Sequence, residues 1–247
     1  MTSSDHTLAP MLRKLKKWCV LSEEDRQAVL ALPYETRLIG KGNYIVREGD
    51  KPVRSCVLLS GFAYRHKVVG NGGRQILSVH MTGDVVDLQN SLLRTADHDV
   101  QALTEAEVAF IPVDAVTELA FSRPAIGMAM WYDTLVDASV HREWTANVGR
   151  RDARTRMAHL LCEFGVRLHD AGLGTLCSYE MPMTQEQLAD ATGLTSVHVN
   201  RTLKGLDKDG LTHRSSRSVS IRDWDTLAKA GDFDTRYLHL ADREKPA

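Results

Sequence analysis

The stretch of residues 184–206 constrains the fold most, because it predicts two short helices joined by a glycine. Thr184 is followed three residues later by Gln187, the spacing of a capping box at a helix start. Gly193 then interrupts the helical pattern, as a residue that accepts a positive φ angle can. A second helix follows, whose apolar residues recur every three or four positions. The stretch therefore predicts a helix-turn-helix.

The second of these helices has polar and basic side chains on its outward face. Either Thr195 or Ser196 can cap it, and Val199 and Leu203 occupy its inward face. Such an outward face suits the major groove of double-stranded DNA. The plain structural alternative is an ordinary helical hairpin. The residues of this motif that we expect to contact DNA are Thr184, Thr195, Ser196, Val197, His198, Asn200, Arg201 and Lys204.

The segment that follows predicts a β-wing and makes the ordinary hairpin a poorer explanation. Residues 211–214 and 218–221 have the composition of two short strands around a serine-rich turn. Arg214 and Arg217 lie at the tip of this wing, where basic side chains can contact phosphates.

Residues 36–112 predict an all-β domain. Short apolar runs alternate with glycine-containing turns, and Asn71-Gly72 is typical of a hairpin. This pattern indicates a small β-barrel or jelly roll, a shape that often encloses a ligand.

These two regions together resemble a known family. VHVNRTL followed by LDKDGL is similar to the recognition helix and wing of the Crp/Fnr superfamily of bacterial transcription regulators. Upstream, REGD, LSG, GGRQI and TGDVV occur in the order found in that family's cyclic-nucleotide-binding β-roll. The resemblance covers nearly the whole chain. It implies an α+β fold with an N-terminal β-roll (jelly roll), a long dimerisation helix and a C-terminal winged helix-turn-helix.

A long helix that begins near Ser122 and Pro124 has apolar residues on two sides. A helix of this kind must be covered on both sides. One side can pack on the β-roll, and the resemblance implies that the twin helix of a second copy covers the other. The alternative is a helix buried inside a monomer. We expect the dimer contacts at Met128, Trp131, Leu135, Val136, Val140 and Trp144, with Val140 and Trp144 as the preferred seam positions.

Four segments follow from these assignments: a β-roll sensor domain at 1–121, a dimerisation helix and hinge at 122–150, a winged helix-turn-helix at 151–230 and a C-terminal tail at 231–247. Short helices are expected at 11–20, at 22–32 after a Ser22 cap, and from an Asp114 cap to Phe121. Further helices are expected at 156–170 and from an Asp223 cap to Ala230. Residues 1–10 and 241–247 are expected to be disordered, whereas the apolar residues of the tail, Phe233, Tyr237 and Leu240, should pack on the body.

Charge and composition restrict the partners and the compartment. The chain has 31 basic and 32 acidic residues, so a nucleic-acid footprint must be local. Residues 150–222 contain eleven basic and eight acidic residues, which places a modest basic excess beside the motif. Neither a membrane-spanning run nor a signal core is evident. The four scattered cysteines fit a reducing cytoplasm and argue against a zinc or disulfide framework.

The effector cannot be named from the sequence. In cyclic-AMP-binding relatives a glutamate and an arginine follow the second Gly-Asp turn, and the matching positions here are Leu88 and Ala96, with Arg94 two residues away. Cyclic AMP is therefore not expected to bind. A lone Cys19 near the N-terminus lacks the ligands of an iron–sulfur centre. Haem held by a β-roll histidine and redox sensing by Cys162 remain alternatives.

The best interpretation is a cytoplasmic, homodimeric, sequence-specific DNA-binding regulator that acts on a palindromic promoter site, with an unknown effector or none. RNA polymerase is a further candidate partner. No GxSxG, HExxH or P-loop motif is present, so we expect neither an enzyme nor catalytic residues, and no cofactor or metal is assigned. An enzyme, or a small-molecule-binding module that does not bind DNA, are the competing hypotheses.

The resemblance also implies a base preference. The family's arginine that matches Arg201 reads guanine, through two parallel hydrogen bonds to O6 and N7. The acidic residue that many members have nearby is Val197 here, which can only pack on a thymine methyl group. We therefore expect a half-site that keeps the guanine and changes the neighbouring preference.

Overall fold

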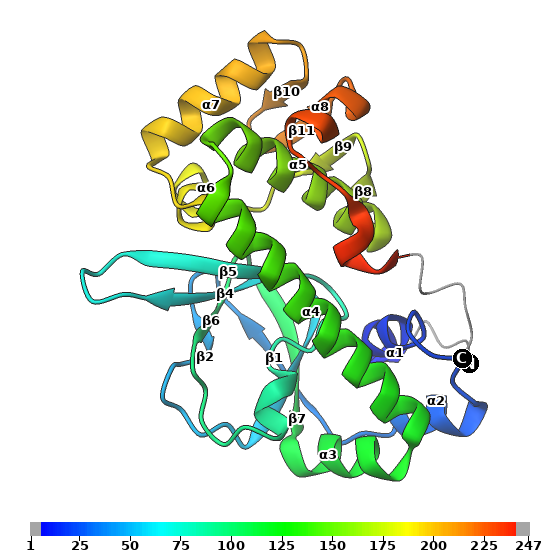
Figure 1. Cartoon of the computed structure of the whole chain (residues 1–247). Helices are drawn as coiled ribbons and strands as arrows, with labels where there is room; N and C mark the ends of the chain where they lie inside the picture. Colours follow the sequence, from blue (N-terminus) through cyan, green and yellow to red (C-terminus); the bar gives the residue numbers. More distant parts are fainter. Residues whose placement is uncertain (1–5, 241–247) are drawn as a thin grey trace. The chain divides into compact units, whose positions relative to one another are not determined.

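The computed structural model of the chain describes residues 6–240 (Figure 1). The described residues divide into two compact units, one containing 6–67, 78–139 and 239–240, the other containing 68–77 and 140–238. The disorder expected for 1–5 and for 241–247 lies outside the described residues. Leu8 and Ala9, which were also expected to be frayed, are buried, so that expectation is wrong for them.

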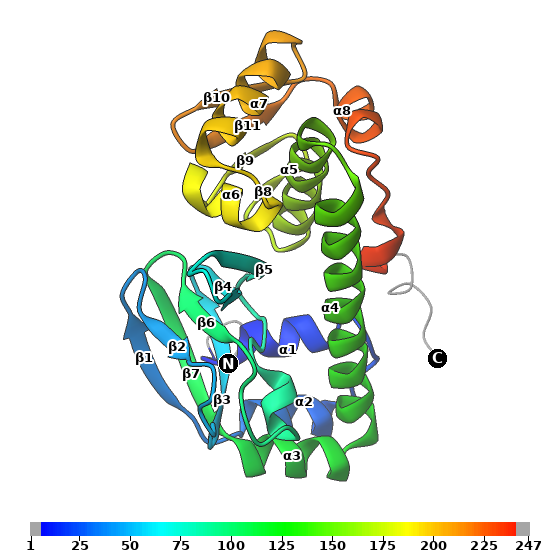
Figure 2. The same ribbon diagram turned by 60° about the vertical axis from the view of Figure 1, so that its left-hand side comes forward.

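Two sheets, with strand orders β1-β7-β3 and β2-β6-β4-β5, supply the strands of the first unit (Figure 2), apart from the end of β4 and the first four residues of β5, which fall within 68–77. Apolar side chains from both sheets, including those of Cys56, Val100 and Val108, form a common core. Glycine at position 72 has a φ of 82°, as the predicted hairpin between β4 and β5 requires. The strands are β1 (Glu35–Ile39), β2 (Tyr44–Val46), β3 (Arg54–Ser60), β4 (Ala63–Val68), β5 (Arg74–His80), β6 (Asp99–Ala102) and β7 (Ala106–Pro112).

Helices at both ends of this β-roll form a second core with the outer face of β3 and β7. The expected cap of α2 is confirmed, since Asp25 N donates to Ser22 Oγ over 3.1 Å. Two expectations are corrected: the first helix ends at Leu15, and Asp114 lies inside the first turn of α3, after Pro112. The elements are α1 (Ala9–Leu15), α2 (Glu23–Leu30), η2 (Leu88–Ser91), α3 (Val113–Ser122) and the first part of α4 (Pro124–Arg150).

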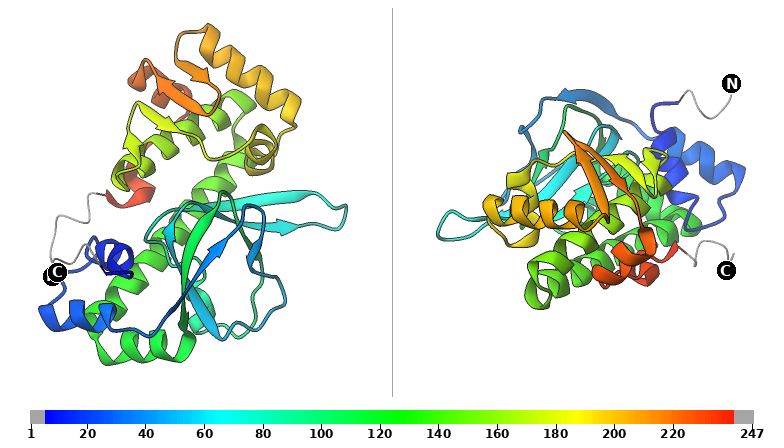
Figure 3. Two further views of the ribbon diagram at one scale, coloured as in Figure 1. Left: turned by 180° about the vertical axis from the view of Figure 1, so that it is seen from behind. Right: turned by 90° about the horizontal axis from the view of Figure 1, so that it is seen from above.

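The second unit is a winged helix-turn-helix (Figure 3). Its four-stranded sheet has the order β10-β11-β9-β8, so the predicted wing is extended by two short strands that the sequence pattern did not reveal. Tyr179 of β9 fixes this sheet to α5, because its buried hydroxyl donates to the Leu161 carbonyl over 2.6 Å. The elements are α5 (Ala153–Asp170), β8 (Gly174–Thr175), β9 (Ser178–Glu180), α6 (Gln185–Thr192), α7 (Ser196–Lys208), β10 (Thr212–Ser215), β11 (Ser218–Ile221), α8 (Trp224–Ala230) and η3 (Thr235–Leu238).

The segment after α8 packs on α5 through Phe233 and Tyr237, as expected for these two residues. Phe233 and Tyr237 contact the ring of His159, with ring centroids 5.2 and 5.8 Å away. Gly231 makes this approach possible, since a Cβ there would lie only 2.6 Å from the backbone nitrogen of His159. The Tyr237 hydroxyl also donates to the buried carboxylate of Glu163 over 2.7 Å. This contact region belongs to the second unit.

The end of α4 is part of the same hydrogen-bonded network. Trp144 Nε1 donates to both carboxylate oxygens of Glu163, at 2.9 and 3.1 Å. Trp144 and Val140 are each only 6 % exposed within the single chain. They cannot line a dimer seam while they are covered in this way, so their assignment as the preferred seam positions is corrected.

Candidate nucleic-acid interface

The helix-turn-helix is fixed by local hydrogen bonds at each helix end. Gln187 N donates to Thr184 Oγ1 over 3.2 Å, and Thr184 N donates to Gln187 Oε1 over 2.9 Å, which completes the predicted capping box. Gly193 ends α6 with a φ of 64°. Thr195 is the cap of α7, because its Oγ1 accepts from His198 N over 3.2 Å. This leaves the side chain of Ser196 on the surface of the first turn.

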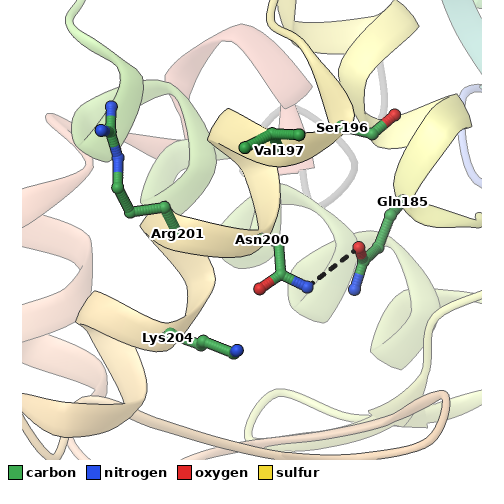
Figure 4. A pocket seen from close by; sticks show the side chains of 6 residues that line it. All are labelled: Gln185, Ser196, Val197, Asn200, Arg201 and Lys204. Carbon is green, nitrogen blue, oxygen red and sulfur yellow. Dashed lines mark hydrogen bonds between the residues drawn. The ribbon is translucent and has the colours of Figure 1, made fainter.

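The two faces of α7 differ sharply in burial. Val199, Leu203 and Leu206 are at most 1 % exposed and hold the helix on the domain core. The opposite face borders an open groove of about 540 Å³ (Figure 4). Val197 is 81 % exposed there, among polar and basic side chains. The residues that line the groove are Gln185, Ser196, Val197, Asn200, Arg201 and Lys204.

The positive charges of this unit fall into two groups. Arginines of α5 have partners inside the protein: Arg154 pairs with Asp209 at 2.7 Å, and Arg156 donates to the Thr192 carbonyl over 2.9 Å. Within residues 6–240, no such partner is recorded for Arg201 or Lys204, and both are exposed. Unpaired cations beside a groove are available to phosphate and base acceptors.

The wing presents a second basic surface. Its turn contains Ser216 at a φ of 57°, and the carbonyl of Arg217 accepts from Met181 N over 2.8 Å. The backbone of the tip is therefore fixed, while the side chain of Arg217 is exposed and that of Arg214 is half-buried.

The predicted DNA contacts thus fall into distinct positions. Ser196, Val197, Asn200, Arg201 and Lys204 come together in the groove, and Arg214 and Arg217 are on the wing. Thr184 and Thr195 are exposed caps, and His198 is half-buried beside them. Sequence reasoning missed Gln185, whose Oε1 accepts from Asn200 Nδ2 over 3.1 Å. In the sequence, only the position of Gln185 directly after the Thr184 cap could have indicated that it lies near the recognition helix.

The interior of the β-roll contains a buried charge cluster that the sequence did not reveal. Arg65 is 6 % exposed, and it donates to Asp137 Oδ2 over 2.7 Å and to the Val86 carbonyl over 2.9 Å. Asp87 is fully buried and accepts from Cys56 N over 2.8 Å. Burial raises the pKa of Asp87 to about 6, against the lowering effect of these hydrogen bonds and of Arg65. Ala96, at the register of the family's ligand-binding arginine, is itself buried.

The first part of α4 has an exposed apolar face. Met128, Trp131 and Leu135 are 45, 60 and 51 % exposed, and Val136 is half-buried next to them. These four of the six predicted dimer residues remain accessible in the single chain.

Two family models match the chain in the order that its fold predicts. One, described as a cyclic nucleotide-binding domain, matches residues 36–123, and the other, a Crp-like helix-turn-helix domain, matches residues 155–230. The chain belongs to the Crp/Fnr family of transcription regulators. The resemblance stated from sequence and the predicted fold class are thereby confirmed.

Individual relatives agree with this family. The chain is 27 % identical to the transcriptional activator protein FnrL of Cereibacter sphaeroides, over 87 % of this chain and 88 % of that protein. It is 25 % identical to the nitrogen fixation regulation protein FixK of Azorhizobium caulinodans, over 70 % of this chain and 69 % of that protein. Its fold is similar to FixK2 of Bradyrhizobium japonicum, with a TM-score of 0.74, 22 % identity, and coverage of 81 % of this chain and 98 % of that one.

Within residues 6–240, none of the helices combines the length and apolar character that crossing a membrane requires. The same residues contain no cluster of three or more His, Cys, Asp or Glu side chains suited to a metal ion.

Proposed function

We propose that this DNA-binding transcription regulator acts as a homodimer on a palindromic site in the cytoplasm. The observation that carries the proposal is the outward face of α7, where Arg201 and Lys204 are exposed and unpaired among the described residues. Two copies related by two-fold symmetry would place their α7 helices in successive major grooves. The half-site centres would then be about one helical turn, roughly 34 Å, apart.

The exposed face of α4 supports the homodimer. Met128, Trp131 and Leu135 present adjacent apolar side chains, and contiguous apolar patches of this kind typically mark protein contacts. The contact is assigned to Met128, Trp131, Leu135 and Val136 alone, because Val140 and Trp144 are covered by their own chain.

Base reading is assigned to two exposed residues of α7. Arg201 can form paired hydrogen bonds with guanine O6 and N7, and the Val197 methyl groups can pack on the methyl group of a thymine. Lys204 and the wing residues Arg214 and Arg217 contact phosphates, which adds affinity without sequence preference. Ser196 and His198 add phosphate or water-mediated contacts near the start of the helix.

Selection of bound DNA from a random pool tests this proposal directly, because it gives both the half-site and its spacing. Arg201→Ala should cost about 1–3 kcal/mol on the selected site and remove the guanine preference at one position of each half-site. Lys204→Ala is the matched control on the same face. It should weaken binding to all sequences alike and reduce the slope of log affinity against log salt by about one. If Arg201→Ala leaves the selected motif unchanged, the assignment of α7 fails.

An effector is not part of the proposal. Regulation by a haem or by a cysteine stays the second candidate. The cysteines differ in burial, and therefore in how readily their thiols can react. Burial raises the pKa of the Cys162 thiol to about 12, which opposes the reactive thiolate form. Cys56 is also buried, which raises the pKa of its thiol, so a redox response would have to come from the exposed Cys177 or the half-buried Cys19.

A further inference from the structure

The groove beside α7 contains one hydrogen bond between its two walls. Asn200 projects from the middle of α7, and Gln185 is the first residue of α6 (Figure 4). Asn200 Nδ2 donates to Gln185 Oε1 over 3.1 Å, and both side chains line the groove. The next glutamine, Gln187, is occupied by the capping box and cannot exchange with Gln185 in this role.

This contact leaves a specific set of hydrogen-bonding atoms on Asn200. A carboxamide has one acceptor oxygen and two N–H donors. Gln185 takes one N–H, so Oδ1 and the second N–H of Asn200 stay available. That pair matches the N6 donor and N7 acceptor that adenine shows in the major groove, the usual partner of asparagine.

The contact also restricts how the amide can turn. An exposed asparagine rotates freely about its side-chain bonds, and ordering it on a base edge costs conformational entropy. A hydrogen bond that holds the amide before DNA arrives reduces this cost, which is the effect of preorganisation. Among the neighbours of Asn200 on the outward face of α7, Val197, Arg201 and Lys204 have no side-chain acceptor, and the acceptor that the structure gives to Asn200 Nδ2 is Gln185 Oε1 of α6.

We propose that Asn200 selects an adenine in each half-site and that Gln185 is its positioning residue. This assignment rests on the proposed function, because it needs α7 in the major groove. It goes beyond it by adding a second hydrogen-bonded base to the guanine of Arg201. The half-site would then contain a guanine, an adenine and a thymine, read by Arg201, Asn200 and Val197 respectively.

The first test is DNA selection with Asn200 variants of the full chain. Asn200→Ala should keep the guanine and lose the adenine preference, with a loss of affinity of about 5- to 150-fold on the wild-type site. Asn200→Asp is nearly isosteric but has no N–H to offer, so it should exchange adenine for cytosine, whose N4 amino group donates to a carboxylate. An unchanged adenine in both variants overturns the assignment of Asn200.

The second test separates positioning from a direct phosphate contact by Gln185. Gln185→Ala should reduce the discrimination of adenine and leave that of guanine intact. It should have no further effect on adenine discrimination in a chain that already has Asn200→Ala, because a positioning residue acts only through its partner. Gln185→Glu retains the acceptor, so it should restore the adenine preference while its charge weakens binding to every sequence. Equal weakening of all sequences by Gln185→Ala, additive with Asn200→Ala, overturns the positioning role.

The outcomes also distinguish this inference from the function on which it rests. A motif whose guanine depends on Arg201, but in which no position responds to Asn200, overturns only the inference. Failure of the wild-type chain to select any motif, or a guanine that survives Arg201→Ala, overturns the proposed function and this assignment with it.

Discussion

Replacing Tyr237 by phenylalanine should destabilise the DNA-binding unit, because it removes one donor from a buried carboxylate. Glu163 is fully buried and its two oxygens accept from Trp144, Arg167 and Tyr237. The Tyr237 hydroxyl is the shortest of these contacts, at 2.7 Å, and it also lies 3.2 Å from His159 Nε2. The substitution leaves the ring in place on His159, so the loss is confined to the hydroxyl.

The expected cost follows from the charge and the burial of the acceptor. A hydrogen bond to a charged group contributes about 1.5–3 kcal/mol, compared with about 1 kcal/mol for a neutral pair. Glu163 keeps its bonds from Trp144 and Arg167, so the larger penalty of an orphaned buried charge does not apply. We therefore expect Tyr237→Phe to lower the free energy of unfolding by about 1.5–3 kcal/mol. With a urea slope of about 1–3 kcal/mol/M, the midpoint should move by on the order of 1 M.

Urea unfolding of the full chain, followed by tryptophan fluorescence at fixed protein concentration, measures this loss. Tyr132→Phe is the matched control: the Tyr132 ring stacks on Trp18, and no hydrogen bond of its hydroxyl is recorded within residues 6–240. The control should change stability by less than about 0.5 kcal/mol. If Tyr237→Phe is no more destabilising than the control, with an unchanged urea slope, then the hydroxyl does not support Glu163 and the reasoning fails.

Three further predictions concern assembly, the sensor and pH. Sedimentation of the wild-type chain at micromolar concentration should show a dimer, and Trp131→Glu should shift it to the 27.5 kDa monomer. The control Thr145→Glu changes an exposed position of the same helix and should leave the dimer intact. A wild-type monomer contradicts the proposed dimer contact. Calorimetry with millimolar cyclic AMP should detect no binding heat, and a sub-micromolar dissociation constant would mean that the register around Ala96 is wrong. Burial raises the pKa of Asp87 from 3.8 to about 6, so folding takes up a proton at this group between these values, and the contribution of Asp87 to the free energy of unfolding should rise as pH falls from about 6 to 4. Asp87→Asn keeps an oxygen that accepts from Cys56 N and Ser55 Oγ. The difference in free energy of unfolding between the wild-type chain and this variant should therefore depend on pH between about 4 and 6 and be constant above that range. A difference that is independent of pH contradicts the raised pKa.

The sequence predicted best those features that short-range hydrogen bonds create. The capping box at Thr184 and the caps at Ser22 and Asp223 all join residues three positions apart, so their signal lies within a single turn. Gly193 was predictable for the same reason, because a left-handed backbone at a helix end selects glycine whatever the tertiary context.

The spacing of apolar residues along α4 did not predict which part of the structure covers each of its apolar faces. Val140 and Trp144 recur on α4 as regularly as Trp131 and Leu135, and the pattern is the same whether the cover is a second copy or α5 of the same chain. The distinction depends on Glu163, nineteen residues away from Trp144, whose buried carboxylate accepts the indole N–H. A glutamate inside a helix pattern gives no sign that it is buried.

Contacts between distant polar residues were likewise invisible in the sequence. Arg65 meets Asp137, and Asn200 meets Gln185, across separations that no local pattern encodes. The two strands β8 and β9 were missed because they span only two and three residues, too few for an alternating pattern. The site residues on α7 were therefore predictable, because they share one face of a single helix. Gln185 of α6 was not, because only the fold brings it beside them.

The capping threonines clarify which substitutions can report on DNA recognition. Thr184 and Thr195 each accept a backbone N–H through the hydroxyl oxygen, which leaves the O–H of each free to donate to a phosphate. Their structural and DNA-binding roles are thus compatible, but an alanine substitution removes both at once and also costs about 1 kcal/mol of helix stability. Arg201 and Asn200 avoid this ambiguity, since neither side chain caps a helix and both lie on the face opposite the buried Val199 and Leu203. Changes in base preference at Arg201 can therefore be attributed to contacts with DNA, whereas those at Asn200 are compared with the Gln185 variants, because Asn200 also donates to Gln185 of α6.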